Sequence, residues 1–296
     1  MTPTTPDATC RRGFTLVELL ISMIVAAIIG SALVRMTLSQ ARFMDQQEAW
    51  REARSVSRGG INRLLSDLRA VEASGGLRAA AAGGQDFTIR VPYAFGILCG
   101  INASIYTVSL LPVDATMYAE SGYTGFAVRG SNGTYTYHDS NMLPVAGTPG
   151  YCLNGLYDSI TTLPAFNGSP AGTRVNIVRT AGAILPPPAR GSIIYLYRDI
   201  RYEFKASVAI PGRIGLWRTK VTGGETEELA APFDATARVN FYNLNATPAQ
   251  AAVPTLADVR GLELVLNGMS ERTPGGSAAP KTANMTTSVF FENRPD

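Results

Sequence analysis

The sequence predicts an α+β fold, in which one long amino-terminal helix packs on a mostly antiparallel β-sheet that carries a large loop-rich insertion. Hydrophobic residues run without interruption over residues 14–34 and then recur at helical intervals to about residue 73. From residue 85 onward, alternating and β-branched runs are separated by Gly, Asn and Pro. Apolar residues make up 46% of the 296 positions, so the chain can bury a substantial core.

The first predicted element is a transmembrane helix over residues 14–34. This segment contains one charged residue, Glu18, and no proline. At about 1.5 Å per residue, a helix of that length spans roughly 30 Å, the thickness of a bilayer's hydrocarbon core. A secretory signal peptide has a shorter apolar region that ends at a small-residue cleavage site, whereas this pattern continues into Arg35. We therefore expect the segment to be retained.

Residues 35–73 are expected to continue the same helix in amphipathic form. A helix should loosen or bend at Gly59-Gly60, because each glycine weakens it by about 1 kcal/mol. The spacing then becomes regular, and the apolar stripe should dock on a sheet; it consists of Ile61, Leu64, Leu65, Leu68 and Val71. Residues 74–84 are rich in Gly and Ala, which predicts a linker.

The remainder, residues 85–296, is predicted to form one β-rich domain. Residues 97–188 are richer in Gly, Asn, Ser and Tyr and end in three prolines, which indicates an insertion of loops and short strands on a more regular sheet. The expected strands cover residues 87–91, 104–111, 125–129, 174–179, 192–197, 202–209, 215–221, 237–242, 261–266 and 286–291.

The most informative string precedes and opens the apolar segment. It reads Arg11, Arg12, Gly13, Phe14, Thr15, Leu16, Val17 and Glu18, followed directly by apolar residues. This string resembles the class III signal of type IV prepilins and pseudopilins. The resemblance implies that prepilin peptidase cuts between Gly13 and Phe14, removes residues 1–13 as a leader and methylates the new amino group of Phe14.

Elementary chemistry gives these residues reasons of their own. Gly13 has no Cβ, which lets the backbone enter a protease site, and Arg11 with Arg12 resists translocation and keeps this end cytoplasmic. Glu18 is costly inside an apolar helix unless it is paired. Cleavage would create an amine at Phe14, one turn away. The resemblance implies that Glu18 neutralises a neighbouring subunit's amino terminus during assembly; the alternative is a carboxylate that reaches the nearby interface.

The rest of the chain more loosely resembles minor pilins of the PilW type and the J-type, PulJ-like, minor pseudopilins of type II secretion. The similarity lies in residues 61–75 and in the strand segments that follow residue 190. Many major pilins have a proline where this chain has Arg35, and they are much shorter. The resemblance thus implies a minor subunit, which joins a tip or initiation complex of a type IV pilus or a type II secretion pseudopilus.

The same resemblance implies the partners and the location. The partners would be prepilin peptidase, other major and minor pilins or pseudopilins contacted through the amino-terminal helix, and the inner-membrane assembly platform. We expect a single pass through the bacterial inner membrane, with the amino terminus cytoplasmic and the β-rich domain extracytoplasmic, and later a place in the pilus or pseudopilus. The net charge of +3 gives no direct support for nucleic-acid binding.

Catalytic and metal-binding patterns are not found in the sequence, so neither an enzyme nor a cofactor is predicted. His138 is the single histidine, which nearly excludes histidine-based triads and zinc sites, and no P-loop or dinucleotide-binding glycine motif occurs. His138, Asp139 and Asn141 could bind a cation, but a polar turn explains them better.

Cysteines and tyrosines gather in the predicted insertion. Cys99 and Cys152 would form a disulfide once the domain leaves the cytoplasm, or else stay as two buried thiols. The tyrosines could form an adhesive patch or pack half-buried on sheet faces; they are Tyr93, Tyr106, Tyr118, Tyr123, Tyr135, Tyr137, Tyr151 and Tyr157. The alternative function is therefore an adhesin or a DNA- or ligand-binding module that acts through residues 97–188.

Overall fold

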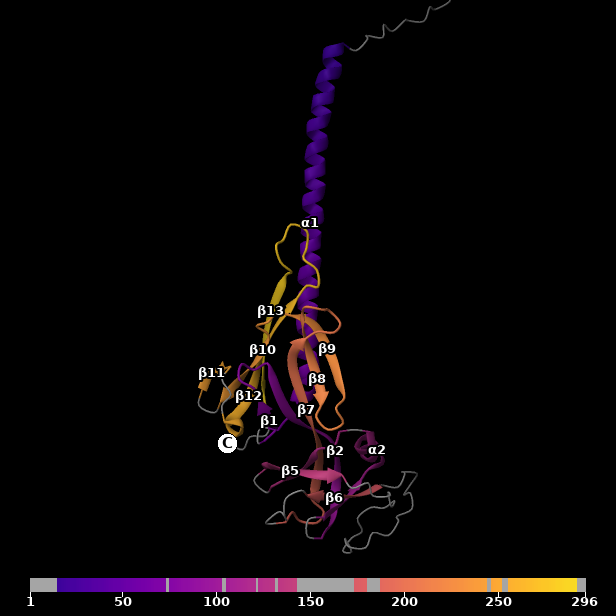
Figure 1. The fold of residues 1–296 in the computed structure, drawn as a ribbon, viewed down its shortest axis with the longest axis vertical. Helices are drawn as coiled ribbons and strands as arrows, with labels where there is room; N and C mark the ends of the chain where they lie inside the picture. The colour runs from indigo at the N-terminus through magenta and orange to yellow at the C-terminus, as the bar shows by residue number, and fades with distance from the viewer. Residues whose placement is uncertain are drawn as a thin grey trace, which may run out of the picture.

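The fold combines one long helix with an antiparallel β-sheet, as the sequence predicts. The computed structural model describes residues 15–291, except residues 73–74, 103–104, 121, 131–132, 143–172, 180–186, 244–245 and 252–254. Over these residues the strands form a single 13-stranded sheet. Figure 1 shows that the amino-terminal half of the helix projects far beyond the sheet. The predicted α+β class is thereby confirmed.

Helix α1 (Leu16–Leu68) is unbroken over 53 residues, so the loosening expected at Gly59-Gly60 is not found. Gly60 instead lets the helix come close to the sheet. A Cβ at this position would lie 2.9 Å from Cζ of Phe233 and 3.2 Å from Cδ1 of Leu266. The cost of glycine in the helix is offset by this close packing. The helix ends at Leu68, earlier than residue 73, and the expected linker contains strand β1 (Leu77–Ala80).

The remaining elements follow in chain order. They are β2 (Asp86–Asn102), β3 (Ile105–Leu110), α2 (Pro112–Glu120), β4 (Gly125–Arg129), β5 (Tyr135–Met142), β6 (Thr173–Arg179), β7 (Ile193–Ala206), β8 (Ile214–Lys220), β9 (Thr226–Phe233), β10 (Arg238–Asn243), β11 (Ala246–Gln250), the short 3₁₀ helix η1 (Leu256–Asp258), β12 (Val259–Met269) and β13 (Thr282–Phe290). The sheet order is β1-β2-β3-β6-β5-β4-β7-β8-β9-β12-β10-β11, with β13 beside β12 and β2 also beside β7.

Two long strands, β2 and β7, connect two parts of the sheet. Because they pair with each other as well as with β3 and β4, the strands β2, β3, β6, β5, β4 and β7 form a closed antiparallel ring. This ring, the distal barrel, lies at the end of the molecule farthest from the start of α1 (Figure 1). Its interior holds a separate apolar core that includes Leu98, Tyr106, Phe126, Ile177 and Leu196.

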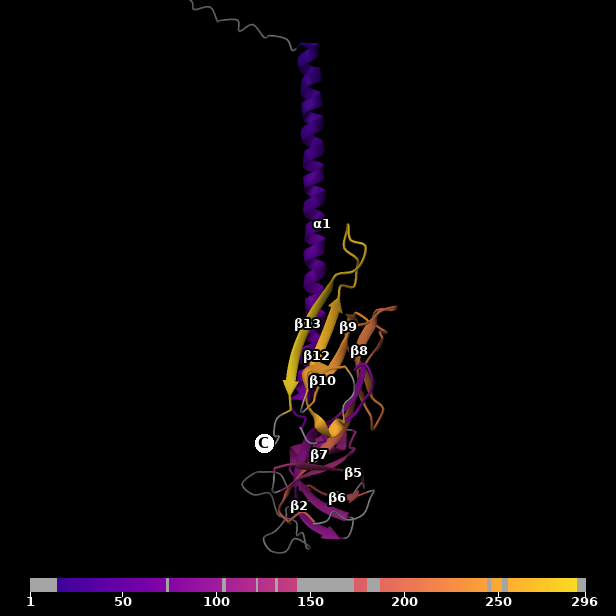
Figure 2. The same ribbon diagram turned by 90° about the vertical axis from the view of Figure 1, so that its left-hand side faces the viewer.

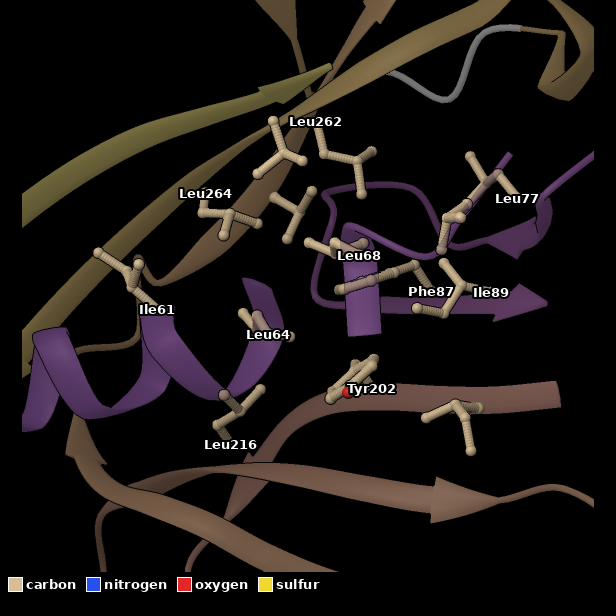
Figure 3. Packing of buried hydrophobic residues seen from close by; sticks show 14 of the residues in the cluster. Ile61, Leu64, Leu68, Leu77, Phe87, Ile89, Tyr202, Leu216, Leu262 and Leu264 are labelled. Carbon is tan, nitrogen blue, oxygen red and sulfur yellow. The ribbon is translucent and has the colours of Figure 1, made fainter. Parts of the chain in front are cut away.

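A second and larger core lies where the carboxyl-terminal part of α1 packs on the sheet. Ile61, Leu64 and Leu68 of the predicted stripe point into this core. Figure 3 shows them facing strand residues such as Phe87, Tyr202, Leu216, Leu262 and Leu264. The docking of the stripe on a sheet is as the helical spacing predicts, with Leu65 only partly buried at its edge.

Several sequence expectations about the strands need correction. The runs at 192–197 and 202–209 lie largely in one strand, β7, which ends at Ala206, and the intervening polar residue Asp199 is buried there in an ion pair with Arg78. His138, Asp139 and Asn141 lie in strand β5, so the polar turn expected there is wrong. Asp139 is held in the strand region by bonds from Arg78 and Tyr197. Strands β1, β5, β9 and β11 and helix α2 were not predicted.

The helix meets strand β12 at a buried serine. Ser57 is fully buried, and its hydroxyl contacts the carbonyl oxygens of Leu266 at 3.1 Å and Ala283 at 3.0 Å. The same oxygen accepts a hydrogen bond from the backbone N–H of Gly268 at 2.8 Å. A Cβ at residue 268 would collide with the carbonyl oxygen of Ala53, so glycine is required for this approach.

Replacing Ser57 should therefore destabilise the fold. Ser57→Ala removes the acceptor of the buried Gly268 N–H, and we expect the free energy of unfolding to fall by about 1–3 kcal/mol. Denaturant unfolding of the detergent-solubilised full chain, followed by tryptophan fluorescence, measures this. Ser55→Ala is the matched control because Ser55 is exposed on the same helix. Equal effects of the two substitutions would contradict the role assigned to Ser57.

Candidate functional site: the amino-terminal helix

The amino-terminal half of α1 is apolar and uncovered. Among the described residues, this is the one helix long and apolar enough to cross a membrane. Its apolar stretch is not buried by any other part of the described chain. A core helix of similar composition would be covered by its own domain, so this stretch needs another apolar environment.

Glu18 lies in the first turn of this helix and forms a reciprocal cap with Thr15. The Thr15 backbone N–H and hydroxyl each donate to Oε2 of Glu18 at 3.1 Å, and the Glu18 N–H donates to Oγ1 of Thr15 at 3.3 Å. Such a capping box satisfies orphan groups at a helix start. The carboxylate also lies at the positive end of the helix dipole. The only acidic residue of the first turn is thus held beside the start of the helix.

The other residues of the predicted signal, Arg11, Arg12, Gly13 and Phe14, lie outside the described residues. Thr15 is the N-cap of α1 and adopts an extended backbone. The predicted cleavage site between Gly13 and Phe14 therefore lies just before the N-cap, Thr15, in the sequence.

Residues 9–34 match the family described as the prokaryotic N-terminal methylation motif. The chain carries the processing signal of pilin-type proteins. The motif indicates processing by prepilin peptidase and assembly with other pilins, and with the apolar helix it indicates anchoring in a membrane at the amino terminus. Pilin-like proteins that carry this motif are structural proteins rather than enzymes. Comparisons of the chain with curated proteins and with solved structures gave no match.

The predicted disulfide is only partly visible. Cys99 on β2 is fully buried and is disulfide-bonded. Cys152 lies outside the described residues, so its pairing with Cys99 stays a prediction.

The other candidate residues are the tyrosines of the predicted insertion, and those that the structure describes are buried or half-buried. Tyr106, Tyr118 and Tyr123 are buried in the barrel core, whereas Tyr93, Tyr135 and Tyr137 are half-buried. Tyr151 and Tyr157 lie outside the described residues. Within the described part of the chain, no group of three or more His, Cys, Asp or Glu residues is arranged to hold a metal ion.

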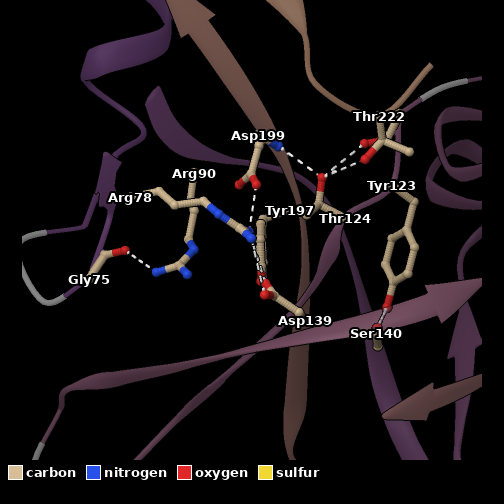
Figure 4. A network of polar contacts seen from close by, with 11 residues as sticks. Gly75, Arg78, Arg90, Tyr123, Thr124, Asp139, Ser140, Tyr197, Asp199 and Thr222 are labelled. Atoms are coloured by element: carbon tan, nitrogen blue, oxygen red, sulfur yellow. Dashed lines mark hydrogen bonds and ion pairs between the residues drawn. The ribbon is translucent and has the colours of Figure 1, made fainter. Parts of the chain in front are cut away.

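The structure reveals a polar network that the sequence did not predict, at the junction of the barrel with the rest of the sheet (Figure 4). Arg78 Nη1 lies 2.6 Å from Oδ2 of Asp199 and 2.9 Å from Oδ1 of Asp139. The Tyr197 hydroxyl donates to the same Asp139 oxygen at 2.8 Å. Arg90 lies over the Tyr197 ring, 5.6 Å from its centroid. These residues come from four strands, which is why no local sequence signal marks them.

The two carboxyl groups of this network titrate differently. Asp199 is only 1% exposed, and burial raises its pKa to about 6 although Arg78 and Arg90 act in the opposite direction. Burial would raise the pKa of Asp139 as well, but the Tyr197 hydrogen bond and the Arg78 charge lower it below its usual value. The Asp199 Oδ1 atom is buried without a hydrogen-bond partner, which is consistent with an unfavourable ionised form.

Stability should therefore depend on the protonation of Asp199. Because the pKa of Asp199 is raised, the stability that protonated Asp199 gives to the fold is fully present below about pH 4 and is lost as the pH rises through about 6. When the pH falls from 7 to 4, we expect the free energy of unfolding of the wild type to rise by about 2–3 kcal/mol more than that of the Asp199→Asn variant. Unfolding of both proteins across this range measures the difference, and the variant corrects for other titrating groups. A difference independent of pH would contradict the assignment.

Proposed function

We propose that this protein is a minor pilin or pseudopilin, a structural subunit that waits in the inner membrane and then joins a pilus or pseudopilus at its tip or initiation complex. The observation that carries this proposal is Glu18, a carboxylate at the start of a long apolar helix that no other part of the described chain covers. A simple membrane anchor does not need a carboxylate at this position, whereas a subunit that packs against its neighbours can use it to neutralise an amine.

The processing step supplies a partner for Glu18. Cleavage between Gly13 and Phe14 would create an α-amine next to Thr15, and its positive charge suits the carboxylate that Thr15 already holds. When subunits pack side by side, the amine of one chain and the Glu18 of its neighbour neutralise each other inside the apolar bundle. Removing the leader also removes Arg11 and Arg12, which would otherwise keep this end at the cytoplasmic surface.

The membrane position follows from the charges that bound the apolar segment. Glu18 and Arg35 are 17 positions apart, or about 25 Å along a helix at 1.5 Å per residue, so both groups would lie near the two surfaces of the hydrocarbon core. The sheet and the barrel then stand outside the cytoplasmic membrane. Arg35 at the position of the usual major-pilin proline supports a minor rather than a major subunit, and so does the length of the chain, which would keep 283 of its 296 residues after removal of residues 1–13.

Substituting Glu18 tests this proposal. Glu18→Ala and Glu18→Gln should leave membrane insertion and leader cleavage intact but lower the fraction recovered in sheared pili or pseudopili roughly tenfold, since a charge-assisted pair contributes about 1.5–3 kcal/mol. Quantitative immunoblotting of membrane and sheared fractions measures both. Ser31→Ala is the control, because Ser31 bonds only within its own helix, to the Ile28 carbonyl. Normal assembly of both Glu18 variants would refute the proposal.

A second candidate function, a surface-binding module presented by the pilus, is favoured by one observation on the distal barrel. Ile97 and Ile193 are direct partners across β2 and β7, and each is nearly half exposed. Phe95, two residues earlier on the same face of β2, is 44% exposed and pairs with Tyr195. Neighbouring exposed apolar side chains of this kind often mark a binding surface.

This candidate predicts a separation of assembly from binding. Phe95→Ser combined with Ile193→Ser should reduce attachment of piliated cells to a surface, or their DNA uptake, while the sheared fraction keeps its normal amount of the protein. The control is Val208→Ser, because Val208 is 76% exposed but lies after the end of β7, away from the barrel. Unchanged attachment and uptake would remove this candidate.

A further inference from the structure

Strand β13 forms a free border of the sheet beside helix α1. It pairs with β12 alone, in a regular register that runs from Gly261 opposite Phe290 to Met269 opposite Thr282. Figure 2 shows β13 along the outer border of the sheet, with no other described strand beyond it. Within the described part of the chain, one edge of this strand therefore has no partner strand.

The backbone groups of β13 alternate between its two edges. At the end of the strand, the Phe291 N–H donates to the carbonyl oxygen of Arg260 at 3.0 Å. At its beginning, the Ser270 N–H donates to the carbonyl oxygen of Lys281 at 2.8 Å. An antiparallel strand bonds to one neighbour through every second residue, so the odd-numbered residues bond to β12. The even-numbered residues direct their N–H and carbonyl groups to the free edge; they are Thr282, Asn284, Thr286, Ser288 and Phe290.

This free edge lacks the features that protect an exposed strand from pairing. Proteins protect such edges with short strands, charged residues, proline or β-bulges. Strand β13 is nine residues long and contains no charged residue and no proline, and its pairing with β12 has no register shift. Its sequence, TANMTTSVF, is rich in residues that favour strands. An uncharged segment of this kind pairs readily with another strand.

The other borders of the described sheet carry such protection. Strands β1 and β11 have only four and five residues, and β11 contains Pro248. Strand β9 pairs with β12 only at Phe233 and has an irregular register with β8. It also carries Glu227, Glu228 and Pro232. Among the described strands, the long unprotected edge is therefore specific to β13.

The two faces of β13 indicate what kind of strand would fit beside it. Met285 and Val289 project toward the larger core that α1 closes, and Met285 is only half-buried. Asn284, Thr286 and Ser288 project from the opposite face and are exposed. An apolar side chain beside Met285 would extend the larger core, whereas Ser or Thr would suit the outer face. The edge therefore fits an uncharged strand with apolar residues at every second position.

A second copy of the chain does not suit this edge. Figures 1 and 2 show β13 running lengthwise beside α1 and pointing away from the free end of that helix. Antiparallel pairing of two β13 strands would thus direct the apolar helices of the two copies in opposite directions, which anchoring in one membrane does not allow. Parallel pairing is less stable per residue. A strand from a different protein can approach in the favourable antiparallel direction.

We propose that the free edge of β13 binds an extended, uncharged strand of a different protein in the pilus or pseudopilus, which adds one strand to the sheet. The choice of partner rests on the proposed function, because a subunit that assembles lies beside such proteins. A strand of about nine residues, roughly 30 Å long, would satisfy the outward N–H and carbonyl groups. These backbone bonds supply the affinity, and the alternation of apolar and polar residues supplies the specificity.

Photocross-linking of the full chain in intact cells tests this inference. A photoreactive phenylalanine analogue at Asn284, which is exposed beside the free edge, should form an adduct with a different protein. Mass spectrometry should place the cross-link in an uncharged segment with alternating apolar residues. The same analogue at Glu227, on the protected edge of β9, is the control and should form none. An adduct of two copies of this chain would overturn the choice of partner, and no adduct from chains recovered in sheared fibres would overturn the inference.

Substitutions on the free edge test the backbone pairing itself. Thr286→Pro removes an outward N–H that β12 does not use, so it should spare the fold yet reduce the Asn284 adduct roughly tenfold or more. Thr286→Val keeps the N–H and is the control, which should retain the adduct. Ser288→Lys is a second variant that keeps the whole backbone, and its charge on the edge should also reduce the adduct.

The outcomes separate this inference from the proposed function. An adduct that persists in both Thr286→Pro and Ser288→Lys would refute strand addition. Normal recovery of these variants in sheared fibres would leave the proposed function intact, whatever happens to the adduct. Absence of the wild-type chain from sheared fibres would instead refute the proposed function and, with it, the choice of partner.

Discussion

The close contact of α1 with strand β12 determines how the rest of the molecule is arranged. The Ser57 hydroxyl forms hydrogen bonds with three backbone groups of the sheet. Gly60 and Gly268 have no side chain, which leaves room for the helix and the strand to approach each other closely. Once the helix is fixed at this point, its first buried residue is Ala49, and the apolar segment that precedes Arg35 projects from the domain. The sheet cannot cover the apolar segment, so another apolar environment must do so.

Helix α1 is therefore one continuous helix whose three parts lie in different surroundings. Its carboxyl-terminal third provides the stripe that closes the larger core, its middle carries exposed charged residues such as Arg42 and Asp45, and its amino-terminal part is apolar with a single carboxylate in the first turn. The second core, inside the distal barrel, does not involve α1, because its buried residues all lie between Ala94 and Leu196 in the sequence. The network around Asp199 joins the two parts of the sheet at their junction (Figure 4).

The sequence predicted what depends on local periodicity and missed what depends on partners distant in the chain. The apolar segment, the stripe from Ile61 to Leu68 and several strands follow from spacing alone. Strand β5 was missed because His138 and Asp139 are polar, yet Asp139 bonds to Arg78 and Tyr197 from other strands. Gly60 suggested a break because its intrinsic cost is local, whereas its benefit lies in Phe233, more than 170 positions away. The closed barrel required strand pairings that no local pattern encodes.

The account depends most directly on the bond between Gly13 and Phe14, since cutting it creates the amine that Glu18 would neutralise. Mass spectrometry of the amino-terminal peptide, taken from protein extracted from membranes and from sheared fibres, examines this bond. The account predicts a peptide that begins at Phe14 and carries a methyl group on its amine. A peptide that begins at Met1 or Thr2 in the assembled protein would contradict it.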